Sequence, residues 1–402
     1  MPAGFPPHAP LVGLSGWSAA LNLRKTFMAK TTMRAVGVIP GEREVRLIEH
    51  QAPQIASANE VKIRSLEVGV CGTDREICTF VYGSPPEGFD YLVLGHESLG
   101  QVVEVGSGVS RFQPGDLVVP SVRRPCQHAS CLACRTDRQD FCYTGDFTER
   151  GIKMTHGFMT EFYVDEQKYL TRVPPELREV AVLVEPLTVA EKGLAQVWEV
   201  QKRLPWVDPK TPAGQLGAGK TAVVLGAGPV GILGAMVLLL NGFKTCVYSR
   251  SRAPNPKSEL LESIGAKYIS SEAESVDQLA GRVGNIDLVY EAVGTAKISY
   301  DVLRVLGLNG IYLFTGIPAP KPPMEIDADI IMRNLVLKNQ AVVGTVNADD
   351  AAFEAAIRDL GSFLKRWPDA LRSLITGRYR IDQYRELLLG KATGIKNVVV
   401  LA

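Results

Sequence analysis

The sequence predicts an α/β protein in which a doubly wound parallel sheet is combined with a second, mainly β domain. The length of 402 residues exceeds what a single hydrophobic core usually serves. Strand and helix patterns alternate through the middle of the chain, around a glycine-rich turn. Short runs of Val, Ile and Leu separated by Gly and Pro fill the first part, a pattern typical of twisted β structure.

Composition and charge argue against several classes of partner. Lys and Arg total 44 against 43 Asp and Glu, and a net charge of +1 is too weak to attract nucleic acid or acidic lipid. The most apolar stretch, Pro229 to Leu240, contains two glycines and is shorter than a membrane span of about 18 residues. Residues 9–23 precede Arg24 and Lys25, the reverse of the order in a secretory signal. We therefore expect a cytoplasmic protein that binds neither nucleic acid nor membrane.

Changes of pattern along the chain predict its domains. Residues 1–32 lack periodicity and are rich in Pro, Ala and Gly, so we expect a disordered N-terminal extension. We expect residues 33–200 to form the mainly β domain, which ends in the helical pattern LTVAEKGLAQVWEV. Residues 201–340 form the nucleotide-binding domain. Residues 341–402, from QAVVGTV to NVVVLA, return to strand patterns around one helix, and we expect them to rejoin the first domain.

A glycine-rich turn between a strand and a helix marks the candidate nucleotide site. The strand TAVVL is followed by Gly226-Ala-Gly228-Pro229-Val230-Gly231 and then by the apolar helix ILGAMVLLL. The first glycine permits a tight turn, the second lets the backbone approach a pyrophosphate, and the third lets the helix pack on the strand. The N-terminus of the helix then faces the phosphate charge.

The end of the next strand indicates which nicotinamide cofactor is bound. The strand TCVYS ends without the carboxylate that would hold the ribose hydroxyls of NAD. The chain continues through Ser249-Arg250-Ser251-Arg252, and guanidinium groups suit the 2′-phosphate of NADP. We therefore predict that NADP is preferred, with NAD as the alternative.

Four of the seven cysteines lie in one polar loop, at Cys126, Cys131, Cys134 and Cys142. Four thiolates can close a tetrahedral zinc site that has no open position, so this site would stabilise the fold rather than catalyse. In a cytoplasmic chain an odd cysteine count favours metal over disulfides. His128 lies three positions before Cys131, so the first ligand is either Cys126 or His128.

A second candidate metal site combines residues that are far apart in the sequence. Cys71 follows a strand, and His96 and Glu97 lie between two strands. Glu185 begins the helix that leaves the β domain. Taken singly, such a cysteine or histidine is more often a core residue. Together they supply a thiolate, an imidazole and carboxylates with a position left for water or substrate, as catalytic zinc requires.

These motifs resemble those of zinc-containing medium-chain dehydrogenases and, within them, the glucose 1-dehydrogenase branch. The resemblance extends from Met33 to the C-terminus and is carried by Cys71-Gly-Thr73-Asp74, Gly95-His96-Glu97, RQDFC at 138–142, Glu149-Arg-Gly, HGFM at 156–159, Glu185-Pro-Leu, Glu191-Lys192 and Val346-Asn347. It implies a Rossmann-type nucleotide domain, a GroES-like catalytic domain and assembly as a homotetramer or homodimer.

The resemblance also implies roles for individual residues. Cys71, His96 and Glu97 would hold the catalytic zinc, with Glu185 as a fourth ligand or a water-mediated contact. The residues expected to bind the sugar are Thr73, Glu149, Glu185 and Asn347. The residues expected on the NADP side are Ser249, Arg250, Ser251, Thr345, Val346 and Asn347.

Two positions depart from the pattern of the branch. Relatives often have two residues between the first two structural cysteines, where this chain has four. Val189 stands where some relatives carry an aspartate toward the sugar, so the choice among glucose, galactose and pentoses stays open.

The predicted reaction is the zinc-dependent oxidation of the anomeric carbon of D-glucose, or another aldose, to the aldonolactone, with hydride transfer to NADP or NAD. Zinc would act as a Lewis acid on the anomeric oxygen, and the proton would leave through Thr73 or a zinc-associated glutamate. A polyol or threonine dehydrogenase of the same superfamily is the nearest alternative. A non-catalytic NADP-binding protein is a remote one.

Overall fold

The computed structural model describes residues 32–208, 210–212, 214–319 and 321–401. The expected extension at residues 1–32 therefore lies outside the described residues, except for Thr32, which begins the first strand.

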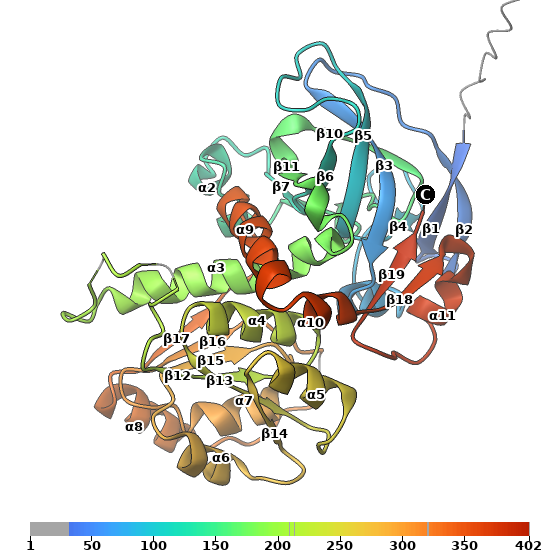
Figure 1. Cartoon of the computed structure of the whole chain (residues 1–402). Helices are drawn as coiled ribbons and strands as arrows, with labels where there is room; N and C mark the ends of the chain where they lie inside the picture. The colour runs from blue at the N-terminus through green and yellow to red at the C-terminus, as the bar shows by residue number, and fades with distance from the viewer. Residues whose placement is uncertain (1–31, 209, 213, 320, 402) are drawn as a thin grey trace, which may run out of the picture. The chain divides into compact units, whose positions relative to one another are not determined.

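A six-stranded sheet forms the nucleotide-binding half, and it confirms the predicted doubly wound parallel fold (Figure 1). Its order is β14-β13-β12-β15-β16-β17, and each neighbouring pair is parallel. The order reverses between β12 and β15, which is the switch point of a Rossmann-type sheet. The strands are β12 (Thr221–Leu225), β13 (Lys244–Ser249), β14 (Lys267–Ser270), β15 (Leu288–Glu291), β16 (Ile311–Phe314) and β17 (Ala341–Gly344).

Helices cover both faces of this sheet because its side chains alternate between two cores. In β12, Ala222 and Val224 pack with the helices on one face, whereas Val223 and Leu225 pack with those on the other. The first core includes α3 (Val184–Gln201), α4 (Pro229–Leu240) and α5 (Pro256–Ser263). The second includes α6 (Val276–Val283) and α7 (Ala296–Leu303), and α8 (Ala328–Leu337) precedes β17.

The mainly β domain is built on a seven-stranded sheet with the order β11-β6-β5-β3-β19-β18, to which β10 adds by pairing with β3. These strands are β3 (Glu60–Gly69), β5 (Glu97–Val105), β6 (Leu117–Pro120), β10 (Phe162–Glu166), β11 (Leu170–Val173), β18 (Ile375–Arg380) and β19 (Lys396–Val400). Two smaller sheets contain β1 (Thr32–Ile39), β2 (Glu44–Gln51) and β4 (Leu92–Val93), and β7 (Arg123–Arg124), β8 (Thr148–Arg150) and β9 (Met154–Thr155).

Short helices interrupt the β domain and carry several candidate site residues. They are α1 (Gly72–Ile77), α2 (Leu132–Arg135) and the 3₁₀ turns η1 (Gln139–Phe141), η2 (Gln167–Tyr169), η3 (Pro175–Leu177) and η4 (Ala181–Leu183).

The chain returns to the β domain after the parallel sheet. It passes through α9 (Asp350–Arg366), which packs against α3, and then α10 (Pro368–Ser373), η5 (Ile381–Gln383) and α11 (Tyr384–Leu388). At the end β19 pairs with β3, so residues 396–400 lie in the same sheet as residues 60–69.

The expected boundary at residue 340 is wrong by a few residues. The strand in QAVVGTV, which the sequence pattern assigned to the returning segment, is β17, and it pairs in parallel with β16. A short apolar run indicates a strand but not the sheet that it joins. Here the neighbouring edge of β16 accepts it, and the return begins only after Gly344.

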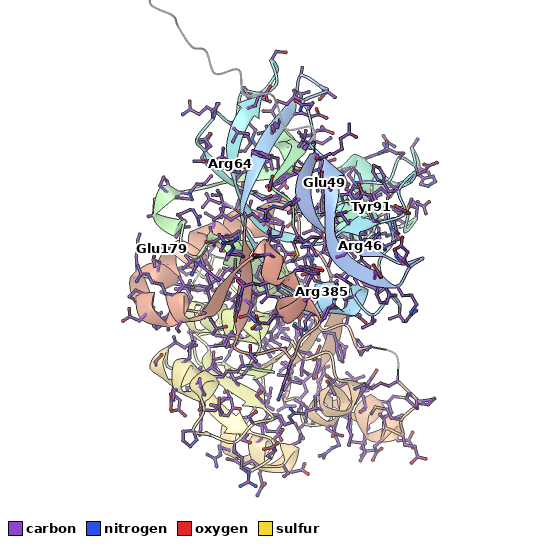
Figure 2. All side chains as sticks on the ribbon, turned by 90° about the vertical axis from the view of Figure 1, so that its right-hand side faces the viewer. Arg46, Glu49, Arg64, Tyr91, Glu179 and Arg385 are labelled. Carbon is purple, nitrogen blue, oxygen red and sulfur yellow. The ribbon has the colours of Figure 1, made fainter. Side chains whose placement is uncertain are left out.

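Charged side chains of both signs are mixed on the β-rich face seen in Figure 2. Arg46 and Glu49 extend from β2, and Arg64 extends from β3. Arg46 pairs with Glu42 at 2.9 Å. Within the described part of the chain, no helix is long and apolar enough to cross a membrane.

Candidate metal and cofactor sites

Strand pairing brings Cys71, His96 and Glu97 together at one end of the main β sheet. Cys71 directly precedes α1, and Glu97 begins β5 opposite Gly69 of β3. One ligand atom from each of the three side chains lies within 4.8 Å of the other two. A thiolate, an imidazole and a carboxylate are donors that zinc accepts in catalytic sites. The chemistry of this group therefore fits a zinc ion.

Asp74 contacts two of these residues, Cys71 and His96. The sequence motif included Asp74, but no role was predicted for it. Its fully buried carboxylate accepts hydrogen bonds from the amides of Cys71 at 2.8 Å and Gly95 at 3.2 Å. It lies 3.4 Å from Nδ1 of His96, an ion-pair distance rather than a formed hydrogen bond. Burial alone would lower the pKa of His96, but Asp74 and Cys71 raise it well above its ordinary value. A carboxylate behind a ligating histidine orients the ring.

Lys396 is a further residue of this site, and no sequence pattern indicated it. Its Nζ lies 2.7 and 2.6 Å from the two carboxylate oxygens of Glu97, and both side chains are almost completely buried. Burial alone would lower the pKa of Lys396, but the charges of Glu97 and Cys71 raise it. The ammonium therefore balances negative charge that gathers around the metal group.

Glu185 and Thr73 lie beside this group rather than in it. Glu185 is in the first turn of α3 and does not join the cluster of Cys71, His96 and Glu97. Burial raises the pKa of Glu185 to about 7, against the opposing charge of His96. Oγ1 of Thr73 is 3.9 Å from Sγ of Cys71.

The cysteine loop forms a second cluster with four sulfur atoms. One sulfur from each residue lies within 4.8 Å of the others, and the residues are Cys126, Cys131, Cys134 and Cys142. His128 is not among them, because its exposed ring points to Asp146, with Nε2 2.6 Å from Oδ2. The geometry thus groups Cys126, and not His128, with the other three cysteines. Four thiolates with no further ligand fit a structural zinc ion.

The glycine-rich turn has the geometry that its sequence predicted. Gly226 has φ +97°, in the left-handed region. A Cβ on Gly231 would lie 2.1 Å from the carbonyl oxygen of Gly226, so helix and strand are in close contact. A Cβ on Gly228 would meet no atom within 4 Å. Pro229 and Val230 begin α4, whose N-terminal amides face this space.

A cavity of about 590 Å³ lies at the carboxyl ends of β12, β13 and β15, beside the switch point. The predicted cofactor residues that line it are Gly226, Gly228, Ser249, Arg250 and Ser251. The cavity is also lined by Asn255, Lys257 and Tyr268, which no pattern in the sequence indicated. An open cavity in front of a glycine-rich turn and a helix N-terminus fits a dinucleotide.

Other residues predicted for the cofactor lie outside this lining. Arg252 is exposed, and its Nη2 donates a hydrogen bond to the carbonyl of Glu272 at 3.1 Å. Thr345 and Val346 follow β17. Oγ1 of Thr345 is buried and has no hydrogen-bond partner in the part of the chain that the structure describes.

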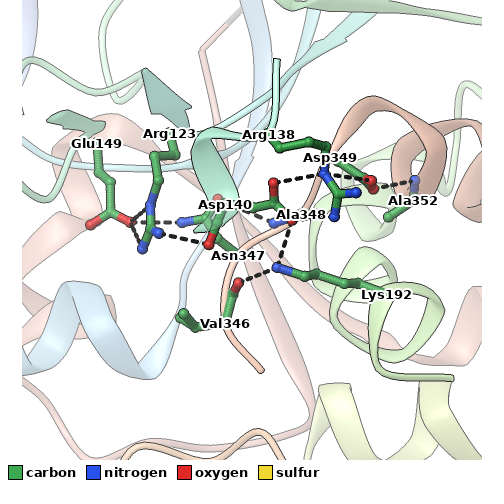
Figure 3. Close-up of polar contacts among 10 residues, drawn as sticks. All are labelled: Arg123, Arg138, Asp140, Glu149, Lys192, Val346, Asn347, Ala348, Asp349 and Ala352. Atoms are coloured by element: carbon green, nitrogen blue, oxygen red, sulfur yellow. Dashed lines mark hydrogen bonds and ion pairs between the residues drawn. The ribbon is translucent and has the colours of Figure 1, made fainter. Parts of the chain in front are cut away.

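Glu149 and Asn347, both predicted to bind the sugar, contact each other directly (Figure 3). Nδ2 of Asn347 donates to Oε1 of Glu149 at 2.6 Å. Nε and Nη2 of Arg123 lie 3.0 Å from the same oxygen. Oε2 of Glu149 accepts no hydrogen bond from the residues that the structure describes.

Two known families match the chain. The Alcohol dehydrogenase GroES-like domain matches residues 57–175, and the Glucose dehydrogenase C-terminus matches residues 178–401.

Three similar proteins match this chain over nearly their whole length. Glucose 1-dehydrogenase of Methanocella arvoryzae is 37% identical over 91% of this chain and 99% of its own. Glucose 1-dehydrogenase of Thermoproteus tenax is 38% identical over the same shares, 91% and 99%. A structure of Haloferax mediterranei glucose dehydrogenase in complex with NADP, Zn and gluconolactone superposes with a TM-score of 0.82, at 32% identity over 92% of this chain and 99% of that chain.

Proposed function

The chain belongs to the glucose dehydrogenase family of zinc-dependent, alcohol dehydrogenase-like oxidoreductases, and from that premise we propose that it oxidises D-glucose at the anomeric carbon to gluconolactone. The observation that carries the proposal is the grouping of Cys71, His96 and Glu97 within 4.8 Å. Three such donors leave a coordination position open for a substrate.

The proposed reaction needs a bound metal, a bound cofactor and side chains that transfer a proton. Cys71, His96 and Glu97 would hold a zinc ion, which would supply a Lewis acid. The residues that line the cavity at the glycine-rich turn would hold NADP, which would supply the hydride acceptor. The hydroxyl of Thr73 acts as a relay: Oγ1 accepts the proton of the anomeric hydroxyl while its own proton passes to a water molecule. Glu185, a carboxyl group in the first turn of α3, is the alternative proton carrier.

Glu149 and Asn347 are proposed to bind the sugar hydroxyls. Arg123 and Asn347 hold one carboxylate oxygen of Glu149, which leaves Oε2 to accept a hydrogen bond from a sugar. A site built to bond a hydroxyl rejects analogues that lack it, because its buried polar atoms then have no partner.

NADP is proposed as the preferred cofactor, with NAD as the weaker one. Arg250 lies in the cavity lining between Ser249 and Ser251, where a guanidinium can bond a 2′-phosphate. None of the three is a carboxylate, so the ribose hydroxyls of NAD lack their usual acceptor there.

Assembly as a homodimer or homotetramer is also proposed. The support is an apolar surface over α8 and β17, which we call the α8–β17 face and which contains Ile330, Met332, Val336, Leu337 and Val342. No residue of α8 is buried, and Val336 is 75% exposed. An apolar surface of this kind usually marks a contact between proteins.

A substrate panel tests the reaction. The zinc-loaded protein is mixed with NADP and, in turn, with glucose, galactose, xylose, sorbitol and threonine, and reduction of NADP is followed. We expect turnover with aldoses and the highest kcat/KM with glucose. A preference for sorbitol or threonine would contradict the proposal, and NADP binding without any turnover would indicate a non-catalytic protein.

A further inference from the structure

The segment from Thr345 to Asp349 joins the nucleotide-binding sheet to α9 and carries a proposed sugar ligand. Asn347 in this segment has φ +62°, a left-handed conformation that asparagine tolerates better than most residues. The 2.6 Å contact from its amide to Glu149 links the segment to the β domain, and Asp349 adds a second link through an ion pair with Arg138 at 3.4 Å. A shift of the segment would therefore move a partner of the proposed sugar-binding carboxylate.

Lys192 holds this segment from α3. Its Nζ donates to the carbonyl oxygen of Val346 at 2.8 Å and lies 2.9 Å from Oδ2 of Asp140 (Figure 3). Lys192 is 3% exposed and Asp140 is 5% exposed, so water replaces neither contact easily. Burial lowers the pKa of Lys192, and the Asp140 carboxylate opposes that shift. A buried ammonium of this kind needs both of its partners.

Asp140 extends the connection into the cysteine loop and back to Glu149. Its carboxylate accepts two hydrogen bonds from Arg138, at 3.0 and 2.9 Å. Its backbone carbonyl accepts one from Nη1 of Arg123 at 3.2 Å. Arg123 in turn donates to Glu149 at 3.0 Å.

These contacts close into one circuit, which we call the junction ring. It joins three parts of the fold: the β domain, α3 and the segment after β17 (Figure 3). Its members are Arg123, Asp140, Glu149, Lys192, Val346 and Asn347. Lys192 is the member that contributes a charge from α3 and contacts both the β domain and the segment.

We propose that Lys192 is a positioning residue, which fixes Val346 and Asn347 and through them orients Glu149 toward the sugar. The role of Glu149 rests on the proposed function, whereas the fixing of the segment does not. Lys192 could otherwise be a structural link that contributes to stability alone. The two roles differ in what happens when Asn347 is removed.

The test uses Lys192→Met, which removes the ammonium and keeps most of the side-chain length. With zinc content unchanged, we expect KM for glucose to rise about tenfold, within the range of coupling between contacting residues. In an Asn347→Ala background the same change should alter KM by less than about twofold, because the effect passes through Asn347. Lys202→Met is the matched control: Lys202 follows the last residue of α3, pairs with Glu199 on the surface, and should leave KM unchanged.

Hydrogen exchange gives a readout that needs no turnover. The amides of residues 346–348 should exchange faster in Lys192→Met than in the unchanged protein or in Lys202→Met. If Lys192→Met does not fold, Lys192→Met with Asp140→Asn neutralises both buried charges, and it should fold while keeping the fast exchange and the high KM.

Equal exchange in all variants would overturn the proposal, as would an effect of Lys192→Met on KM that is the same with and without Asn347. Should the unchanged protein oxidise no aldose while exchange still responds to Lys192→Met, the proposed function would fail and the positioning of the segment by Lys192 would stand.

Discussion

At the scale of single residues, the carboxylate of Glu97 contacts both the candidate metal ligands and a buried lysine. On one side are the donor atoms of Cys71 and His96, and on the other is the buried ammonium of Lys396. A carboxylate has lone pairs enough for a metal and a lysine together. Among the residues that the structure describes, Glu185 lies outside this cluster and forms no ion pair with Lys396, and burial raises its pKa to about 7. We therefore propose Glu97 as the nearer metal ligand of the two glutamates.

Replacing Cys71 tests the catalytic metal site. Cys71→Ala should lose about one zinc per chain and more than about a hundredfold in kcat/KM, because removal of a ligand costs more than removal of its outer partners. The protein should remain folded, since Cys71 is only half-buried. Zinc content by elemental analysis and circular dichroism measure the two outcomes. Cys78→Ala is the control: Cys78 follows α1, belongs to no metal group, and should keep both zinc ions.

The two arginines after β13 allow a test of the proposed preference for NADP. Arg250 lines the cavity and Arg252 does not. Arg250→Ala should raise KM for NADP about tenfold or more and leave KM for NAD nearly unchanged, because only NADP carries the 2′-phosphate. Arg252→Ala should change neither value by more than about twofold. Equal effects of the two substitutions on both cofactors would contradict the assignment.

At the scale of elements, we expect the cysteine loop between β7 and β8 to depend on a bound zinc ion, because its small core consists of four cysteines and Ala133. Cys126→Ser should therefore release about one zinc per chain and lower Tm by roughly 5 °C or more, which corresponds to about 2 kcal/mol. His128→Ala removes only an exposed contact with Asp146 and should change Tm by about 1 °C at most. Zinc loss in the histidine variant instead would show that the grouping is wrong.

The packing of α3 on α9 buries two carboxyl groups together. Glu191 on α3 and Asp359 on α9 are both buried, and Oε1 of Glu191 has no hydrogen-bond partner among the described residues. Burial, reinforced by the charge of Asp359, raises the pKa of Glu191 to about 8 from the ordinary value of 4.5. Arg358 pairs with Asp359 at 3.1 Å and offsets only part of this effect.

This pair predicts a pH dependence of stability. Between about pH 4.5 and pH 8 the folded protein binds more protons at Glu191 than the unfolded chain, so the free energy of unfolding falls as pH rises. Glu191→Gln should abolish this pH dependence. At pH 8 the free energy of unfolding of the variant should exceed that of the unchanged protein by roughly 1–3 kcal/mol. Denaturant unfolding across the pH range measures it. Glu199→Gln, on the surface of the same helix, should show no such trend.

At the scale of the whole molecule, the α8–β17 face predicts how copies of the chain meet. A charge introduced there should separate the copies, because a buried unpaired carboxylate opposes an apolar contact. Val336→Asp should therefore give a monomer in light scattering where the unchanged protein gives a dimer or tetramer. Leu389→Asp, at a half-exposed position in the β domain, should leave the assembly intact. A monomeric unchanged protein would rule the proposal out.

Features determined by neighbours in the sequence could be predicted without the structure. The alternation of strands and helices predicted the parallel sheet, since a period of 2 or 3.6 residues is a local property. The turn from Gly226 to Gly231 and the cysteine-rich loop were found in the same way, because their residues are close in the sequence, but the choice between Cys126 and His128 needed the folded loop.

Only the tertiary structure decided which distant residues meet. Lys396 reaches Glu97 across 299 positions because β19 pairs with β3, and strand register is set by the whole sheet rather than by the local pattern. The same holds for β17, whose sheet its sequence did not reveal, and for Lys192, which contacts Val346 only after α3 and the segment beyond β17 pack together. The sequence by itself thus determined the kinds of elements and the local clusters, and the pairing of strands and helices decided the partners of each charge.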